Sequence, residues 1–261
     1  MTYSSLVRNS QLLSTLKTRV SPDFRLRRLA SRWSGVLDTT LLRLQKWRFG
    51  RGYAGEVFTR IYRENGWDGS ESVSGPGSSL EQTAKLRAEL PEMLSRLDIR
   101  TLTDVPCGDW LWMSHTALPR TLEHYIGGDI VTPLVEDLQS RYGTGERHFR
   151  RIDLLTDRVP TADAVLCRDC LVHFSFADIV AAIRNIKASG ARYLLTTTFV
   201  RLERNTDIVT GQWRPLNLSR PPFQFGPPVA LIQEDCTEGG GRYGDKSLAA
   251  FCVRDLPDIV L

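Results

Sequence analysis

Short apolar runs alternate with helical or loop stretches from residue 101 onwards. Each run has the length of one buried strand, and strands that alternate with helices indicate a parallel sheet with helices on both faces. The sequence therefore predicts an α/β fold. The five runs are TLTDVP (101–106), HYIGGDI (124–130), HFRRIDL (148–154), ADAVLC (162–167) and RYLLTTTF (192–199).

The last two apolar runs predict a different pairing. PVALIQED (228–235) and SLAAFCVRDL (247–256) are separated by CTEGGGRYGDK, which is too short for a crossover helix and rich in glycine. These two strands are expected to be antiparallel neighbours. The whole sheet is therefore predicted to be doubly wound and seven-stranded, mostly parallel, with an antiparallel last strand.

Two helices of this core are indicated by their apolar spacing. FADIVAAIRNIKASG (176–190) has apolar side chains three and four apart, and Gly190 is its expected stop. Ser78, followed three residues later by Glu81, predicts a capping box that starts a helix running up to Pro91. The preceding loop, 65–79, is either a lid over a cofactor or a static linker.

The first fifth of the chain is basic and has helical spacing. SQLLSTLKTRV (10–20) and LDTTLLRLQKW (37–47) have apolar residues on one helix face. Residues 1–51 hold eleven Lys and Arg and two acids, which leaves 23 basic and 28 acidic residues, a net charge of −5, for the rest. These helices either cap the main domain, with solvated arginines, or bind an acidic partner, nucleic acid or a membrane surface. By analogy with similar folds they are also candidates for a homodimer interface.

These patterns divide the chain into three parts. Residues 1–64 are predicted to form a basic helical N-terminal extension, 65–100 a lid loop and the first core helix, and 101–261 the core. Inside the core, the segment at about 201–228 holds five prolines and no helical pattern. Long irregular segments are often functional, so we expect this insertion to contact the substrate.

Composition excludes several classes of protein. With 261 residues, 41% of them hydrophobic and 25% charged, the chain is neither disordered nor fibrous. No stretch reaches the ~18 apolar residues of a membrane span, and MTYSSLVRNS lacks the apolar centre of a secretory signal. Five scattered cysteines are expected to be reduced thiols, and Cys167 and Cys170 lack the second pair that a zinc site needs. We therefore expect a cytoplasmic protein.

Acidic residues follow the first three predicted strands. Asp104 and Asp109 flank Gly108 after the first strand, Asp129 ends the second and Asp153 the third. The carboxyl ends of parallel strands meet at the ligand-binding edge of a sheet. Carboxylates there disfavour a phosphate but attract the sulfonium and amino groups of S-adenosylmethionine, and an acid about twenty residues after a glycine turn suits ribose hydroxyls. The alternative is that these acids only cap a helix or form turns.

The order of these motifs resembles a known family. DVPCGDW (104–110), GGDI (127–130), RIDL (151–154) and AVLCRDCLVHFS (164–175), closed by a hairpin, are similar to class I, Rossmann-like S-adenosylmethionine-dependent methyltransferases over roughly residues 70–255. Where that family has two or three glycines in the first motif, this chain has Gly108 alone. The resemblance implies that the first motif lines the methionine moiety, the second-strand acid holds ribose and the third-strand acid contacts adenine. With the lid loop, the expected cofactor residues are Ser74, Gly75, Asp104, Cys107, Gly108, Asp109, Trp110, Asp129, Ile130, Asp153, Leu154, Cys167 and Arg168.

His173 and Asp169 are the candidate catalytic residues. The resemblance implies that the segment after the fourth strand faces both the cofactor and the substrate. An imidazole has an ordinary pKa of about 6.5, which suits it to accept a hydroxyl proton near neutral pH. The alternative is a buried histidine bonded to backbone. Asp169 has three open roles: orienting His173, binding the cofactor's amino group, or holding a divalent metal ion.

The acceptor is expected to be a small metabolite or a saccharide. A weaker resemblance to bacterial small-molecule and sugar O-methyltransferases favours a hydroxyl as the methylated group. Aromatic, amide and charged side chains of the lid, insertion and hairpin turn suit a polyhydroxylated or planar molecule, although scattered surface residues give the same pattern. The candidates are Trp67, Arg201, Glu203, Trp213, Arg214, Asn217, Phe223, Phe225 and Glu238.

The leading hypothesis is thus an S-adenosylmethionine-dependent O-methyltransferase of class EC 2.1.1. A second hypothesis is a nucleic-acid or protein methyltransferase that uses the basic N-terminus. Nucleic acid is disfavoured because no Asn-Pro-Pro-Tyr motif follows the fourth strand. A third is a scaffold that binds the cofactor without catalysis.

Overall fold

A computed structural model describes residues 53–261 of the chain. Seven strands form one sheet in the order β3-β2-β1-β4-β5-β7-β6. Strands β1 to β5 pair in parallel, whereas β7 pairs antiparallel with both β5 and β6. The predicted α/β class, the seven strands and the antiparallel hairpin are confirmed. The strands are β1 (Thr101–Asp104), β2 (His124–Asp129), β3 (Arg147–Arg151), β4 (Ala164–Cys167), β5 (Tyr193–Phe199), β6 (Ala230–Gln233) and β7 (Lys246–Cys252).

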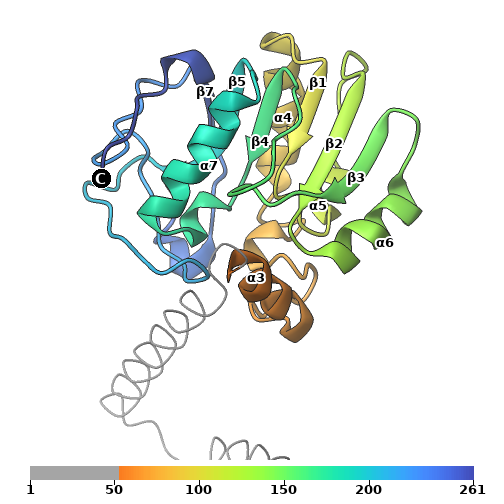
Figure 1. Cartoon of the computed structure of the whole chain (residues 1–261), viewed down its shortest axis with the longest axis horizontal. Coiled ribbons are helices and arrows are strands. Elements are labelled where there is room, and N and C mark those ends of the chain that lie inside the picture. The colour runs from red at the N-terminus through yellow and green to blue at the C-terminus, as the bar shows by residue number, and fades with distance from the viewer. Residues whose placement is uncertain (1–52) are drawn as a thin grey trace, which may run out of the picture. The chain divides into compact units, whose positions relative to one another are not determined.

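Helices cover both faces of the sheet. α7 (Phe176–Ala188) packs on one face, and α4 (Ala84–Arg96), α5 (Leu111–Ser114) and α6 (Thr132–Tyr142) pack on the other. Successive side chains of a strand point to opposite faces, so Val165 of β4 belongs to the α7 core and Leu166 to the α4 core. Figure 1 shows α7 in front of the sheet and α4 behind it. This arrangement is the predicted doubly wound fold.

α7 follows its predicted bounds, but α4 does not. Ser175 accepts a hydrogen bond from the backbone N of Asp178 at the start of α7, and Gly190 after its end has φ +79. α4 starts at Ala84 and continues past Pro91 to Arg96. The predicted capping box is therefore wrong.

The start of α4 is displaced because the residues before it form other turns. Ser78 ends the short helix η2 (Pro76–Ser78), and Thr83 Oγ1 donates to the carbonyl of Ser79 at 2.7 Å. Pro91 has no N–H to donate. The helix persists beyond it because Met93 and Leu94 are buried in the core.

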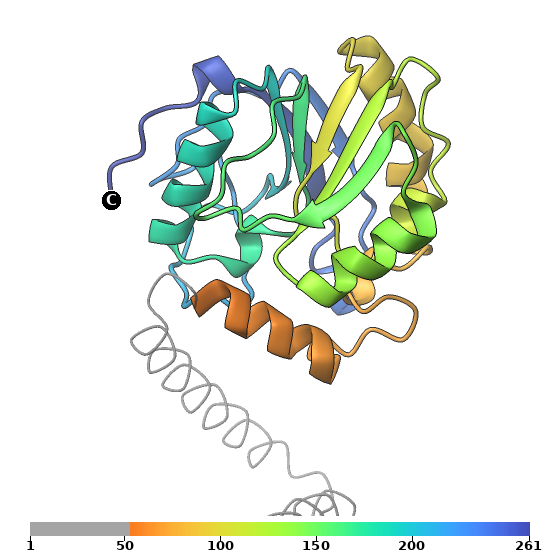
Figure 2. The same ribbon diagram turned by 45° about the vertical axis from the view of Figure 1, so that its right-hand side comes forward.

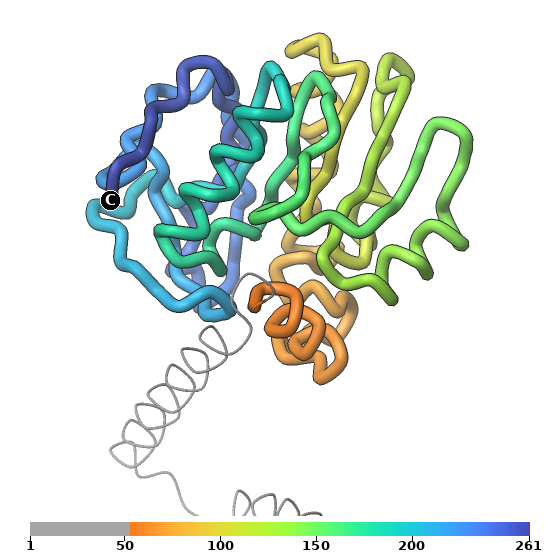
Figure 3. The backbone as a smooth tube through the Cα atoms, in the orientation of Figure 1, coloured from red at the N-terminus to blue at the C-terminus, as the bar shows by residue number. Residues whose placement is uncertain are grey.

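The insertion at 201–228 contains no helix or strand, only an isolated bridge between Thr210 and Gln212. Figure 3 shows it as an irregular segment of chain. Arg214 is buried and donates to the carbonyls of Leu171 and Phe174 at 2.8 and 2.7 Å. These bonds fix the insertion to the segment that follows β4.

α3 (Tyr53–Glu64) is the described part of the predicted N-terminal extension. It packs on the core, since Ala54 and Val57 are buried and Tyr53 Oη donates to the carbonyl of Thr210 at 2.7 Å. The other predicted helices of the extension, their basic surface and the homodimer interface lie outside the described residues.

Three further expectations concern membranes, thiols and metals. No helix within residues 53–261 has the length and apolarity needed to cross a membrane. All five cysteines are free. In the same part of the chain, no group of three or more His, Cys, Asp or Glu side chains is arranged to hold a metal ion.

Candidate active site

The carboxyl ends of β1 to β4 border one cavity, which we call the first cavity. α3 crosses the same end of the sheet, as Figure 2 shows, and lines the cavity together with loop 65–79. The cavity encloses about 1050 Å³, including its open mouth. This edge is where doubly wound sheets bind ligands. Of the expected cofactor residues, those that line it are Ser74, Asp104, Cys107, Gly108, Asp109, Asp129, Ile130, Asp153, Leu154 and Arg168.

The turn after β1 requires its single glycine. The backbone N of Cys107 donates to the carbonyl of Gly128 at 2.8 Å, which ties the turn to β2. Gly108 then has φ +53, in the left-handed region, and a Cβ at this position would lie 2.3 Å from Ser74 Oγ. Only glycine allows both this backbone conformation and the close approach of the loop.

Asp109 holds loop 65–79 against this turn. Its Oδ2 accepts hydrogen bonds from Ser72 Oγ at 2.8 Å and from the backbone N of Val73 at 3.0 Å. In return the backbone N of Asp109 donates to Ser74 Oγ at 3.0 Å. The loop is thus held over the first cavity by reciprocal hydrogen bonds, which fit both a closed lid and a static linker.

Burial controls the charge of the two central acids. It raises the pKa of Asp104 to about 7, although the hydrogen bond from Tyr125 Oη at 2.5 Å opposes the shift. It also raises the pKa of Asp129 to about 6, against hydrogen bonds from the backbone N of Val131 and of Gly108. At neutral pH Asp129 is therefore mostly ionised and Asp104 is about half protonated, and a cation nearby would favour the ionised form of both.

The third acid lies at the other end of the first cavity. Asp153 is buried, and desolvation raises its pKa. Its Oδ1 accepts from the backbone N of Leu155 at 2.9 Å. The cavity wall around it is mostly apolar, which suits a flat ring. The apolar lining residues are Ile130, Val131, Leu134, Ile152 and Leu154.

A second cavity adjoins the first and encloses about 880 Å³ of partly open space. Trp67, Ser74, Asp169 and His173 line both cavities. These four side chains therefore form the border between the two cavities. The other lining residues are Gly75, Pro76, Gly77, Phe199, Trp213, Glu238, Gly239, Tyr243 and Lys246.

His173 ends the short helix η3 (Leu171–His173) that follows β4. Its Nδ1 lies 3.0 Å from the carbonyl O of Gln212, and its ring packs against Trp67 with centroids 5.0 Å apart. A carbonyl only accepts, so Nδ1 donates and Nε2 keeps its lone pair. Burial lowers the pKa of His173 to about 4, although the Gln212 bond and Asp169 oppose this. The imidazole is therefore neutral at neutral pH.

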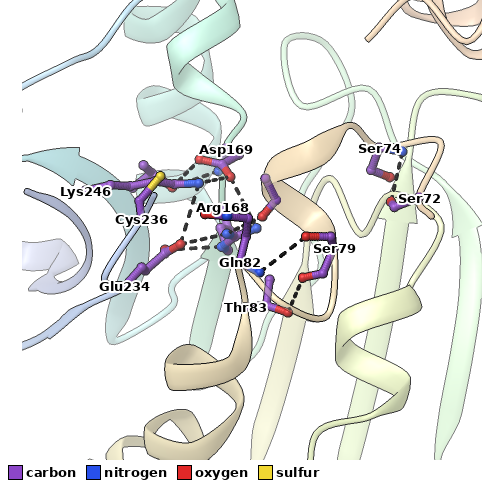
Figure 4. A network of polar contacts seen from close by, with 12 residues as sticks. Ser72, Ser74, Ser79, Gln82, Thr83, Arg168, Asp169, Glu234, Cys236 and Lys246 are labelled. Atoms are coloured by element: carbon purple, nitrogen blue, oxygen red, sulfur yellow. Dashed lines mark hydrogen bonds and ion pairs between the residues drawn. The ribbon is translucent and has the colours of Figure 1, made fainter. Parts of the chain in front are cut away.

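Asp169 belongs to a buried cluster of charges, shown in Figure 4. Its Oδ2 lies 2.6 Å from Lys246 Nζ and 3.2 Å from Arg168 Nη1. Arg168 also forms two bonds to Glu234, at 3.2 and 2.6 Å. Burial alone would raise the pKa of Asp169, but the two cations lower it to about 2. Asp169 bonds to this cluster and to Thr197, whereas the carbonyl of Gln212 orients His173.

Four expected site residues line neither cavity, and a fifth lines only the second. Trp110 has φ +59 and turns into the core, where its Nε1 donates to Tyr125 Oη at 2.9 Å. Cys167 is fully buried within β4. Phe223 and Phe225 are core residues, and Gly75 lines only the second cavity. We leave Trp110 and Cys167 out of the cofactor contacts for these reasons.

Four expected acceptor residues also lie elsewhere. Arg214 and Asn217 are buried and bond to backbone carbonyls of the chain itself. Arg201 and Glu203 are exposed and line neither cavity. Of the acceptor candidates, the second cavity brings together Trp67, Trp213 and Glu238.

Sequence reasoning missed residues from two regions. Phe58 and Tyr62 of α3 line the first cavity, although this helix was assigned to the N-terminal extension. Lys246 and Glu234 complete the charged cluster from β7 and the end of β6. The signal in the sequence was a charged residue at the border of each apolar run. A charged side chain is rarely buried without an oppositely charged partner, so these residues indicate a buried ion pair.

The chain matches solved structures but neither a protein-family model nor a curated protein. One match is the 1,6-didemethyltoxoflavin-N1-methyltransferase of Burkholderia thailandensis, with TM-score 0.52 and 15% identity over 76% of this chain and 86% of that one. That structure has 1,6-didemethyltoxoflavin and S-adenosylhomocysteine bound. The chain has the fold of class I S-adenosylmethionine-dependent methyltransferases.

Other solved structures match with lower TM-scores. The methyltransferase domain of bacterial-CtHen1-C has TM-score 0.49 and 13% identity, over 67% of this chain and 98% of that one. PigF with S-adenosylhomocysteine has TM-score 0.48 and 11% identity, over 66% of this chain and 56% of PigF. The chain thus spans about half the length of PigF. It also spans 66% of bacterial-CtHen1-CN and 57% of LaPhzM.

The first cavity fits the cofactor of that fold. Five carboxylates and one guanidinium line it, and the guanidinium of Arg168 is already paired with Glu234. A pyrophosphate would be repelled by this lining, whereas a cationic nucleoside is attracted. Asp129 keeps free lone pairs for ribose hydroxyls because a carboxylate has about four acceptor sites.

Proposed function

We propose that this protein transfers a methyl group from S-adenosylmethionine, bound in the first cavity, to a hydroxyl of a small metabolite or saccharide in the second. The observation that carries the proposal is the shared border of the two cavities at Asp169, His173, Trp67 and Ser74. The free thiols of all five cysteines favour a cytoplasmic location.

The acids of the first cavity would hold the cofactor. Asp129 would accept hydrogen bonds from the ribose hydroxyls, and Asp153 would accept one from the adenine amino group beside the apolar walls. Asp104 would face the cationic methionine portion once it ionises. When bound, S-adenosylmethionine supplies a methyl group on a sulfonium, which is already a strong electrophile. The protein then has to position the acceptor and exclude water.

His173 would accept the proton of the acceptor hydroxyl. Its Nδ1 is engaged by the carbonyl of Gln212, which leaves Nε2 as the acceptor. Burial lowers the pKa of His173 to about 4, which keeps the ring neutral at neutral pH but makes it a weaker base than free imidazole, so its role depends on the acceptor hydroxyl lying within hydrogen-bond reach of Nε2. Positioned bases contribute about 10²- to 10⁴-fold to the rate.

The proposal is tested by calorimetry with S-adenosylhomocysteine. We expect the wild-type chain to bind and Asp129→Ala to lose at least about tenfold in affinity, since charge-assisted hydrogen bonds are worth about 1.5–3 kcal/mol each. Asp137→Ala is the matched control, because Asp137 is exposed on α6 and pairs only with Arg141 among the described residues. Absence of binding by the wild type would end the proposal.

A further inference from the structure

The second cavity carries one carboxylate without a matching cation. In the buried charge cluster next to this cavity, Arg168 Nη2 lies 2.6 Å from Glu234 Oε2 and Lys246 Nζ lies 2.6 Å from Asp169 Oδ2. Glu238 also lines the cavity. Within residues 53–261, its side chain accepts a hydrogen bond only from the thiol of Cys236, at 3.5 Å, and it forms no ion pair, although its charge also acts on Arg168 from a greater distance. The cluster therefore holds two cations and three carboxylates, and Glu238 supplies the excess negative charge.

Aromatic side chains surround the same space. Phe199, Trp213 and Tyr243 pack edge to face in one group, with the Trp213 and Tyr243 centroids 4.9 Å apart. Trp67 forms the border to the first cavity. Trp213 is 43% exposed, a large fraction for an apolar side chain. Aromatic rings beside a carboxylate that has no ion-pair partner attract cations, both by charge and through the ring quadrupole.

The excess charge lies close to the reacting border. A Cβ at Gly77 would be 3.0 Å from Glu238 Oε2, 3.3 Å from Lys246 Nζ and 3.5 Å from Asp169 Oδ2. These three charged groups thus meet around one point of the lid loop. A compact molecule can contact Glu238 at one end and the Asp169 and His173 border at the other.

We propose that the acceptor is a hydroxylated amine, whose cationic nitrogen is held by Glu238 against the aromatic walls while its hydroxyl faces His173. This rests on the proposed function, because the second cavity is taken to be the acceptor site. A neutral acceptor would leave the Glu238 carboxylate desolvated without a partner, and an anionic one would be repelled by it. Lys246 would attract an anionic acceptor only weakly, because its charge is already neutralised by Asp169 and Glu234.

Matched pairs of probes test the charge requirement directly. Tyramine is compared with para-propylphenol, and choline with the neutral alcohol in which carbon replaces its nitrogen. Binding to the full chain is measured by calorimetry, with and without saturating S-adenosylhomocysteine. We expect each cation to bind about tenfold more tightly than its neutral partner, and Glu238→Gln to reduce this ratio to about threefold or less. Glu92→Gln, an exposed substitution on α4, should leave the ratio unchanged.

The outcomes separate the two proposals. If neither cation binds more tightly than its neutral partner, or if Glu238→Gln keeps the full ratio, the amine proposal is overturned, whatever the cofactor does. If S-adenosylhomocysteine does not bind but the cations show the expected ratio, the cation site stands and the methyltransferase function falls. The thermal stability of Glu238→Gln, compared with that of Glu92→Gln, shows whether the variant is folded.

Discussion

The two cavities are built from different kinds of structure. The first is lined by residues within a few positions of strand ends, such as Asp104, Asp129 and Asp153. The second is lined by a loop, the end of β5, the insertion and the β6–β7 hairpin. Sheet hydrogen bonds bring strand ends together in every chain of this fold, whereas loops meet through contacts of their own. The first cavity therefore reflects the fold, and the second reflects this chain.

Removal of the imidazole at the shared border should have the largest effect. His173→Ala is expected to lower kcat by about 10²- to 10⁴-fold, because the hydroxyl proton loses its acceptor. The affinity for S-adenosylhomocysteine should stay within about threefold of the wild type, since the acids of the first cavity are untouched. Turnover with an identified acceptor and calorimetry measure the two effects. If kcat and S-adenosylhomocysteine affinity fell by the same factor, His173 would contribute to cofactor binding and not to proton transfer alone.

The charge state of the first cavity should make cofactor binding depend on pH. Burial raises the pKa of Asp104 to about 7 and that of Asp129 to about 6, so both are mostly protonated at about pH 5. A cation favours the ionised carboxyls. The affinity for S-adenosylmethionine should therefore rise between about pH 5 and pH 8, by up to about tenfold per pH unit for each carboxyl that must ionise. Asp129→Asn should flatten the profile.

The same shifts predict the opposite trend for the free chain. A buried carboxyl with a raised pKa stabilises the folded state below its ordinary pKa of about 4. That contribution is lost as the pH rises through about 6 and then 7, the values for Asp129 and Asp104. Thermal melts at several pH values should show this loss, and S-adenosylmethionine should reduce it. If the ligand-free protein instead became more stable as the pH rose from about 5 to 8, and Asp129→Asn removed that gain, the raised pKa values of these two acids would be contradicted.

Substitution of the glycine in the β1 turn should weaken both the docking of loop 65–79 and the binding of the cofactor. Gly108→Ala places a Cβ 2.3 Å from Ser74 Oγ at a backbone φ of +53. The left-handed conformation alone costs about 1–2 kcal/mol for an L-residue, so we expect about a tenfold loss of S-adenosylhomocysteine affinity and a lower melting temperature. Gly145→Ala is the control, because a Cβ there has no neighbour within 4 Å. Similar affinities for the two variants would argue against close docking of the loop.

The same contrast explains how far the sequence could predict the site. Asp129 and Asp153 were identifiable because each directly follows an apolar run whose end the sheet fixes. Trp110 follows the same glycine turn, but its side chain is buried in the core and lines neither cavity. Arg214 and Asn217 have side chains that could bind a ligand, but both donate their hydrogen bonds to backbone carbonyls and so hold the insertion in place. Nothing local in a sequence tells whether a loop arginine meets a ligand or a carbonyl of its own chain.

The smallest expected effect concerns the latch that closes the first cavity. Ser72→Ala removes the 2.8 Å bond to Asp109 and the acceptor for the backbone N of Ser74, but the bond from Val73 remains. Two hydrogen bonds are lost, and at about 0.5 kcal/mol each, the low end of the usual range because both are only partly buried, they correspond to about a fivefold loss of S-adenosylhomocysteine affinity. Ser95→Ala removes a bond of similar length, 2.9 Å, on exposed α4 and serves as the control. Amide exchange at residues 72–74 should quicken in Ser72→Ala alone, because the loop would then open more often while the sheet edge beneath it keeps its shape.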